Sequence, residues 1–352
     1  MTTTTVARRI TGGVDTHLDV HVAAALDELG AQLGVQSFAA TASGYRELLG
    51  WLEGFGTLEL VGVEGTGSSG AGLTRHLLSH QVTVVEVDRP NRQRRRRTGK
   101  SDPHDAVAAA RAAQGGDATG SAKTRDGNVE AMRVLRVARS SARRSRTQAI
   151  NQIRSLISTA PEELRAELRD LSIYKVLTVA NAFRHTGNTD VTTVTKLTLR
   201  TLARRALSLE KEVKEIDRLL KTLVAETAPE LNAIDGVGTD VASAILVGAG
   251  DNPERLKSES TFAKRCGVSP LDASSGKQER HRLNRSGDRQ ANSALWHIVF
   301  TRMVNDPRTK HYIERRMKEG RSKKEAIRCL KRYVAREVFA ALPRSEFALD
   351  NP

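Results

Sequence analysis

The sequence predicts a mixed α/β domain, followed by a long helical segment and a mainly helical C-terminal part. Three observations lead to this fold class. Residues 8–113 alternate apolar runs with helical patterns in the order β-β-β-α-β-α-β-α. Residues 129–160 and 199–223 carry the apolar spacing of long helices, and the chain after residue 289 is helical and basic. An apolar period of two indicates a strand, and a period near 3.6 indicates a helix.

The first three strands are predicted to form an antiparallel meander. They cover residues 9–16, 21–26 and 34–39, and Asp and Gly residues at 27–30 provide a turn. A helix at 43–55, a strand at 58–64, a helix at 73–79 and a strand at 82–87 follow. The last helix of this domain is alanine-rich and begins near Asp102, after an arginine block at residues 92–97.

Acidic residues stand where these predicted elements end or begin. Asp15 ends the first strand and Glu64 ends the fourth, while Asp102 and Asp105 lie three residues apart at the start of the last helix. Strands one and four can be neighbours in such a sheet, so the four carboxylates are expected to converge. Carboxylates at short range raise one another's pKa unless cations neutralise them, and two Mg²⁺ ions are the usual solution at a phosphodiester.

Two other interpretations compete with a metal site. Asp102 would serve as a helix N-cap and Asp105 as an acid that complements the helix dipole. Residues 65–70 form a GxGxxG pattern with Glu86 and Asp88 about 20 residues on, as dinucleotide sites require. The dinucleotide interpretation is the weaker one, because hairpin-linked strands precede the pattern and the arginine block follows it. The glycines otherwise allow a phosphate backbone to approach the end of the fourth strand.

The middle of the chain predicts two long, charged helices. Residues 129–160 interleave seven arginines with apolar residues, and almost no acid lies within 131–158 to balance them. Unpaired guanidinium groups suit the phosphate backbone of nucleic acid. Apolar heptads from Leu199 to Leu223 predict a coiled coil, which either folds against the arginine-rich helix or pairs two chains.

The C-terminal part contains a glycine-bearing turn and a serine-bearing loop. Residues 231–245 are typical of a helix-hairpin-helix, in which Gly236 and Gly238 help to expose backbone N–H groups to a phosphate. An ordinary tight turn is the alternative. Ser274 and Ser275 precede a glycine in a basic loop, and no His/Asp pair is spaced to activate either serine.

The charge distribution favours a polyanionic partner. The net charge is +15, yet residues 1–87 contain four Lys/Arg against nine Asp/Glu, so the basic charge belongs to the middle and end of the chain. Binding such a chain releases counterions from nucleic acid, whereas a basic chain without amphipathic aromatic faces binds membranes poorly. No apolar run approaches the ~20 residues of a membrane span and no secretory signal is recognised, so we expect a cytoplasmic protein. Cys266 and Cys329 are too far apart in sequence to suggest a disulfide framework or a zinc module.

Several motifs together resemble the DEDD-type insertion-sequence transposases, a group that includes Piv-like DNA invertases and bridge-RNA-guided recombinases. These motifs are Gly13-Val14-Asp15, Val63-Glu64-Gly65, Lys100-Ser101-Asp102-Pro103-His104-Asp105-Ala106, Gly236-Val237-Gly238 and Ser274-Ser275-Gly276. The resemblance covers about residues 10–340. It implies a ribonuclease-H-like (RuvC-like) catalytic domain at 8–125, an arginine-rich helix and coiled coil at 126–228, and a C-terminal transposase domain at 229–345.

The resemblance also implies a set of site residues and partners. The acids that match are Asp15, Glu64, Asp102 and Asp105, which would hold Mg²⁺, and the serine that matches is Ser275. The adjacent Ser274 remains an alternative nucleophile. DNA, a structured guide RNA and a second copy of the chain are the implied partners, with nucleoid association in a prokaryote. Where such proteins often carry a lysine before glycine, this chain has Arg285-Ser286-Gly287, which leaves the role of that position open.

Three functions follow from these features. The first is a DNA transposase or site-specific recombinase that forms a phosphoserine link. The second is a metal-dependent junction-resolving nuclease in which the acids activate water, and the third is a nucleic-acid-binding protein without catalysis. The serine lies about 170 residues beyond Asp105, across a coiled coil of about 37 Å. We therefore expect Ser275 of one chain to complete the acid site of another, with two chains paired along a seam formed by Leu202, Leu209, Ile216 and Leu223.

Overall fold

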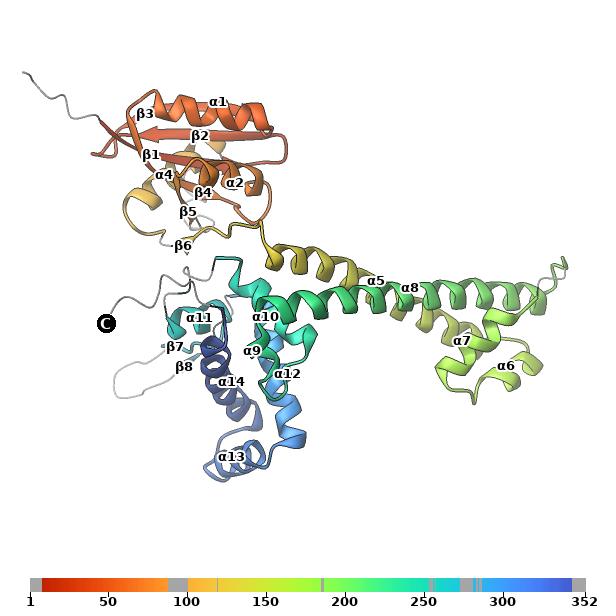
Figure 1. Ribbon diagram of the computed structural model, residues 1–352. Helices are drawn as coiled ribbons and strands as arrows, with labels where there is room; N and C mark the ends of the chain where they lie inside the picture. The colour runs from red at the N-terminus through yellow and green to blue at the C-terminus, as the bar shows by residue number, and fades with distance from the viewer. Residues whose placement is uncertain are drawn as a thin grey trace, which may run out of the picture. The chain divides into compact units, whose positions relative to one another are not determined.

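The computed structural model describes residues 8–87, 101–118, 120–184, 187–252, 256, 258–272, 281–282, 284 and 287–343 (Figure 1). The chain forms two compact units. The first contains the chain up to Gly127 together with a short segment that begins at Gly250, and the second contains Asn128–Ala249 and Ser258–Pro343. The arginine block at 92–97, Ser274 and Ser275 lie outside the described residues.

The first unit is built on a six-stranded mixed sheet. Its strands are β1 (Arg9–Thr16), β2 (Val20–Leu26), β3 (Gln32–Ala39), β4 (Thr57–Glu64), β5 (Thr83–Val87) and β6 (Gly120–Ser121). The strand order is β3-β2-β1-β4-β5-β6. Strands β1, β2 and β3 pair antiparallel, whereas β4 pairs parallel with both β1 and β5. The predicted meander and the predicted β1–β4 neighbourhood are therefore confirmed, and only the two-residue β6 is too short to have left a periodic signal.

Helices cover both faces of this sheet. They are α1 (Ala42–Glu53), α2 (Ala71–Ser79) and α4 (Asp102–Gln114). Because side chains alternate along a strand, β2 divides its apolar residues between two cores. Ala23 and Ala25 join the core beneath α1 and α2, whereas Val22 and Ala24 join the core beneath α4. The helix that carries Asp102 and Asp105 thus packs on the face opposite α1 and α2.

This sheet does not support the dinucleotide interpretation. A doubly wound dinucleotide-binding sheet is mostly parallel, whereas three of the strands here form an antiparallel meander. In addition, the Thr66 hydroxyl donates a hydrogen bond of 2.8 Å to Glu86, one of the two acids predicted for a ribose contact; the other, Asp88, lies outside the described residues.

A buried histidine on the sheet face covered by α1 and α2 makes the stability of this unit pH-dependent. His21 of β2 is fully buried and stacks on Tyr45 of α1, with ring centroids 5.6 Å apart and planes at 7°. Burial lowers the pKa of His21 below its ordinary value of 6.5 and also lowers the pKa of His76, whose ring lies 6.1 Å from Tyr45. Nearby positive or titratable groups, His17 for His21 and Arg46 and His80 for His76, act in the same direction.

We expect the free energy of unfolding to decrease as pH falls below about 6.5. Below that pH the histidines of the unfolded chain bind protons, whereas the buried histidines of the folded chain stay neutral. The stabilisation is therefore complete above the histidine pKa of the unfolded chain and is lost as pH falls toward the lower pKa of the folded chain. His21→Phe keeps a ring against Tyr45 and should flatten this dependence, as measured by urea unfolding between pH 5 and pH 8. A slope equal to that of the wild type would show that His21 is not the responsible group.

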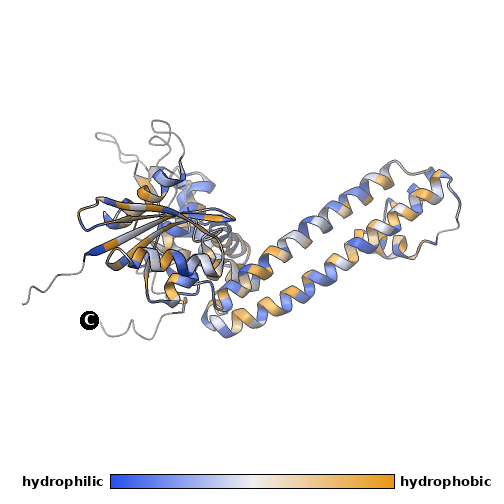
Figure 2. Ribbon diagram, turned by 90° about the horizontal axis from the view of Figure 1, so that it is seen from above, coloured by the Kyte–Doolittle hydropathy of each residue, from blue (hydrophilic) through white to orange (hydrophobic). Residues whose placement is uncertain are grey.

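The second unit begins with an antiparallel helical hairpin. Helices α5 (Asn128–Ser158) and α8 (Val191–Thr227) lie side by side in both views, with α6 (Glu162–Leu168) and α7 (Ile173–Ala182) at the far end (Figures 1 and 2). Arg139 pairs with Asp217 at 2.5 Å and Arg146 pairs with Glu210 at 3.1 Å. A step of seven residues forward on α5 matches a step of seven backward on α8, which is the register of two antiparallel heptads.

The heptad of α8 is therefore used within one chain. Ile216 is buried and Leu202, Leu209 and Leu223 are half-buried. Of the two predicted alternatives, the structure shows the intramolecular hairpin, and the proposed pairing of two chains along this seam is wrong. Sequence could not decide between them, because α5 offers the same apolar spacing that a second copy of α8 would offer.

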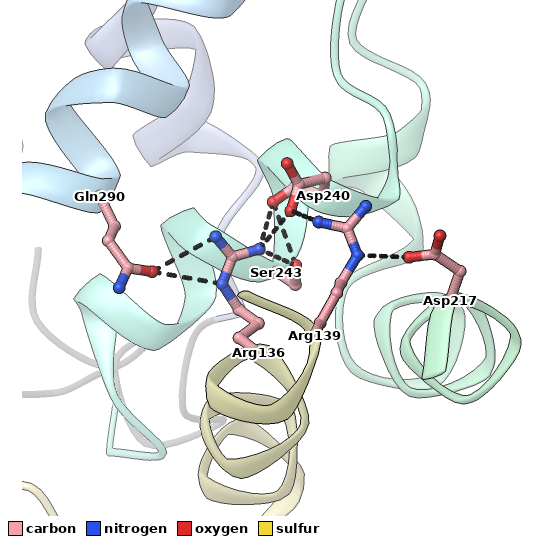
Figure 3. A network of polar contacts seen from close by, with 6 residues as sticks. All are labelled: Arg136, Arg139, Asp217, Asp240, Ser243 and Gln290. Atoms are coloured by element: carbon pink, nitrogen blue, oxygen red, sulfur yellow. Dashed lines mark hydrogen bonds and ion pairs between the residues drawn. The ribbon is translucent and has the colours of Figure 1, made fainter. Parts of the chain in front are cut away.

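The expectation that the arginines of α5 lack acidic partners is also wrong for four of the seven. Arg133 pairs with Glu130, and Arg146 pairs with Glu210. Figure 3 shows the other two, Arg136 and Arg139. They converge on the Asp240 carboxylate of α10 (Thr239–Ala249) at 2.8 and 2.9 Å, and Arg136 also donates to Ser243 and Gln290. The partners of Arg136, Arg139 and Arg146 come from other helices, so a count of acids within α5 could not find them.

The C-terminal part contains helices and a small two-stranded sheet. The helices are α9 (Pro229–Asn232), α10, α11 (Glu259–Arg265), α12 (Arg289–Asn305), α13 (Pro307–Lys318) and α14 (Lys323–Ala340). The predicted helix-hairpin-helix is incomplete, since α9 has only four residues, although Gly236 takes the expected positive φ of 81° before α10. Strands β7 (Leu271–Asp272) and β8 (His281–Arg282) pair antiparallel, so Ser275 belongs to the segment that connects them.

Side chains fix the backbone on either side of this connection. The Asn292 amide of α12 donates to the Cys266 and Gly267 carbonyls at 2.6 and 3.2 Å, and it accepts a hydrogen bond of 2.6 Å from Lys331. The Asp288 carboxylate caps α12. Among the helices that the structure describes, none is long and apolar enough to cross a membrane.

Candidate metal centre

The face of β1 toward α4 is set by Gly13. A Cβ atom at Gly13 would lie 2.2 Å from the Ala110 nitrogen and 2.3 Å from the Ala106 carbonyl oxygen, so α4 rests directly on the backbone of β1. Side chains of a strand alternate between faces, so Asp15 projects toward the α4 side like Gly13. His17 follows two residues later, just beyond the end of β1.

Strand β4 repeats this arrangement. A Cβ atom at Gly62 would lie 2.6 Å from the Ala109 carbonyl oxygen of α4, and Glu64 lies two residues further along the strand. The register pairs Val14 with Val63, which places Glu64 beside Asp15 at the same edge. The Thr16 hydroxyl donates a hydrogen bond of 2.8 Å to the Glu64 carbonyl and ties the two strand ends together.

Helix α4 presents a face of small residues to these glycines. Ala106, Ala109, Ala110 and Ala113 are all buried. Asp102 and Asp105 precede Ala106 and Ala109 by one helical turn, so they lie on the same face at its N-terminal end. The N-cap position belongs to Ser101 rather than Asp102, and Asp105 is 6% exposed. The N-cap interpretation of Asp102 is therefore wrong, and both acids are directed to the sheet edge.

These elements bring Asp15 and Asp102 together around His17. The Nε2 atom of His17 lies 3.2 Å from Asp15 Oδ2 and 3.4 Å from Asp102 Oδ2. One ligand atom from each of the three residues lies within 4.8 Å of the others. Glu64 and Asp105 lie on the same side of the sheet but do not belong to this closest group among the described residues. His17 was not predicted, although its spacing of two from Asp15 at the strand end was a usable signal.

The group fits a divalent cation. A hard cation with octahedral geometry binds oxygen or nitrogen ligands at about 2.1 Å, which places neighbouring ligands about 3 Å apart and opposite ligands about 4.2 Å apart. The two contacts of His17, at 3.2 and 3.4 Å, are close to the separation of neighbouring ligands. Asp15 is 5% exposed, so a cation would neutralise a carboxylate that is costly to bury as an anion.

Comparisons with known proteins match two segments of this chain to transposase families. Residues 12–161 match the DEDD transposase family of the IS110 type, described as a transposase. Residues 228–314 match the family described as "Transposase IS116/IS110/IS902 family". The chain is also 29% identical over 121 residues to the "Insertion element IS110 uncharacterized 43.6 kDa protein" of Streptomyces coelicolor. That alignment covers 34% of this chain and 30% of the relative's length.

Proposed function

This chain belongs to the IS110 family of transposases, and from that premise we propose that it cuts and rejoins the DNA of an insertion element. The observation that carries the proposal is the meeting of Asp15 from a strand end with Asp102 from a helix start, in a group that fits a divalent cation. In this proposal residues 8–125 form a ribonuclease-H-like domain that holds the acids. Residues 126–228 form the helical hairpin, and residues 229–345 supply the serine.

The acids have the role of holding Mg²⁺ against a scissile phosphate. Asp15 and Asp102 would bind a cation directly, and Glu64 and Asp105 at the same sheet edge would complete the site. The proposed stoichiometry is two ions. Such cations neutralise the phosphate and stabilise the oxygen that leaves it. The family resemblance and the position of all four acids on the α4 side of the sheet support this assignment.

Ser275 is proposed as the nucleophile. Its hydroxyl oxygen would attack phosphorus, lose its proton to solvent or a nearby base, and form a phosphoserine ester while one backbone P–O bond breaks. The leaving sugar oxygen takes up a proton. One ester replaces another, so the bond energy is retained and the reverse attack by a sugar hydroxyl rejoins a strand. The choice is supported by the family resemblance and by the position of Ser275 in the sequence between the paired strands β7 and β8.

The discriminating experiment is a search for a covalent protein–DNA product. Wild-type protein, Mg²⁺ and labelled DNA should yield an adduct that survives denaturing electrophoresis and is lost in Ser275→Ala. The matched variant Ser274→Ala should retain it. Cleaved DNA without an adduct would instead favour a junction-resolving nuclease in which the acids activate water. If the protein yields neither cleaved DNA nor an adduct, its role would be nucleic-acid binding without catalysis.

The proposed partners are DNA, a structured guide RNA and further copies of the chain. Charge along the helical hairpin supports a contact with nucleic acid. Residues 143–205, which include its far end, contain twelve Lys/Arg against five Asp/Glu. The opposite end, residues 128–142 and 206–227, contains seven Lys/Arg against six Asp/Glu. The far end is therefore the part of the hairpin that fits a phosphate backbone.

Arginines at the two ends of the hairpin should differ in their contribution to nucleic-acid affinity. Arg143 and Arg154 are exposed and form no ion pair among the described residues, whereas Arg136 and Arg139 are engaged by Asp240. Arg143→Ala with Arg154→Ala should weaken binding several-fold and reduce the slope of log affinity against log salt by about 1 to 2, since each phosphate contact contributes about 0.9.

The control is Arg136→Ala with Arg139→Ala. This pair should change the salt slope little and instead lower thermal stability, because the network around Asp240 loses charged hydrogen bonds worth about 1.5–3 kcal/mol each. Filter binding and thermal unfolding of both double variants separate the two roles. An equal loss of salt slope in both would contradict the assignment of phosphate binding to the far end.

A homo-oligomer with shared sites remains part of the proposal, although the α8 heptad is occupied by α5. Mixing Asp102→Ala with Ser275→Ala chains tests it. A site completed in trans should recover part of the activity in the mixture, whereas a site made within one chain would leave the mixture inactive.

A further inference from the structure

His17 is the one member of the closest donor group that the four-acid assignment leaves without a role. Its side chain is 38% exposed, yet its Nε2 atom is buried. This atom lies 3.2 Å from an Asp15 oxygen and 3.4 Å from an Asp102 oxygen and nevertheless makes no hydrogen bond in the part of the chain that the structure describes. One ring nitrogen thus faces two carboxylate oxygens without aligning with either.

That geometry is typical of a coordinating atom. An N–H group donates along one direction and aligns with a single acceptor, whereas ligands of one cation converge on a common centre and lie beside one another. The two contacts of Nε2 approach the separation of about 3 Å expected between neighbouring ligands at about 2.1 Å from an ion. The backbone supports this position, because the His17 N–H donates to the Val20 carbonyl at 3.1 Å and fixes the turn after β1.

We propose that His17 is a third protein ligand of the cation, through Nε2, and that it makes the site bind Mn²⁺ more tightly than Mg²⁺. The inference rests on the proposed metal centre. A site of carboxylates alone suits Mg²⁺, whereas an imidazole nitrogen is a softer ligand that Mg²⁺ accepts reluctantly. Adding an imidazole nitrogen to the carboxylate ligands therefore shifts the selectivity of the site away from Mg²⁺.

Pulsed electron paramagnetic resonance of bound Mn²⁺ tests this without any activity assay. The wild-type protein loaded with one equivalent of Mn²⁺ should show the modulation of a directly bound ¹⁴N nucleus. His17→Gln should lose it. His104→Gln is the matched control, since His104 is an exposed imidazole beside Asp105 on α4, and this variant should keep the modulation. Circular dichroism confirms that each variant is folded.

Affinity supplies the second measurement. Calorimetric titration should show that His17→Gln raises the dissociation constant for Mn²⁺ at least about tenfold, as loss of even indirect ligand support does, and changes that for Mg²⁺ less. The inference is overturned if wild-type Mn²⁺ carries no ¹⁴N modulation, or if His17→Gln leaves the ratio of the two affinities unchanged. If either of these results is found while Mn²⁺ binding still depends on Asp15, the proposed metal centre is retained and His17 is not one of its ligands. If wild type binds no Mn²⁺, both the inference and the proposed metal centre fail.

Discussion

Asp102→Ala is expected to reduce metal-dependent DNA strand cleavage at least about 100-fold without unfolding the protein. The reason is that cations at such sites contribute several kcal/mol to the transition state, and each 1.36 kcal/mol corresponds to a factor of ten. Asp102 is half-buried at the start of α4, and its carboxylate faces His17 and solvent rather than the apolar core. Removing it should therefore spare the fold. Cleavage of labelled DNA at saturating Mg²⁺ measures the loss.

Asp117→Ala is the matched control for this prediction. Asp117 is an exposed acid shortly after the C-terminal end of α4 and belongs to no donor group among the described residues. The Asp117→Ala variant should cleave DNA at the rate of the wild type. Full activity of Asp102→Ala in Mg²⁺ would show that the site has been assigned to the wrong residues.

Gly13→Ala should have the second large effect, although it changes no acid. The added Cβ would meet backbone atoms of α4 at 2.2 and 2.3 Å, and backbone cannot rotate away as a side chain can. Helix α4 must then move off β1 and carry Asp102 and Asp105 from Asp15. Overpacking of this kind costs about 1–3 kcal/mol or more, so thermal unfolding should occur several degrees lower. The affinity of the variant for Mn²⁺ should also decrease, because the acids are moved apart.

Gly50→Ala provides the comparison. Gly50 lies in α1, and a Cβ there would meet no atom within 4 Å, so alanine should be neutral or slightly stabilising through its higher helix propensity. The unfolding temperature and the Mn²⁺ affinity of both variants test whether the contact of α4 with Gly13 positions the acids. If Gly13→Ala matches Gly50→Ala in both measurements, the close seat of α4 on β1 does not position the acids.

Sequence patterns predicted much of the first unit because its elements are regular and local. The short runs that form β1 and β2, the helical spacing around Leu48 and Leu52, and the acids at the ends of elements are all visible in residues close together in the chain. The close approach of α4 to Gly13 and Gly62 could not be predicted. It depends on which helix covers which glycines, and spacing along the chain does not carry that information.

The same limit explains the errors in the second unit. The acids that pair with Arg136, Arg139 and Arg146 lie 64 to 104 residues away in sequence, so a count of acids within α5 does not include them. The heptad of α8 was predicted with two candidate partners, the arginine-rich helix and a second chain. Apolar spacing could not choose between them, because it specifies a seam and not the helix that fills it. His17 was not predicted as a ligand, although it follows Asp15 by two positions, just beyond the end of β1.

The metal centre is the central claim, and anomalous diffraction from crystals soaked in Mn²⁺ tests it most directly. A peak is expected between Asp15 and Asp102, within about 2.3 Å of a carboxylate oxygen of each, and Asp15→Asn should lose it. A peak confined to other acids, or none at these residues under saturating Mn²⁺, would contradict the account.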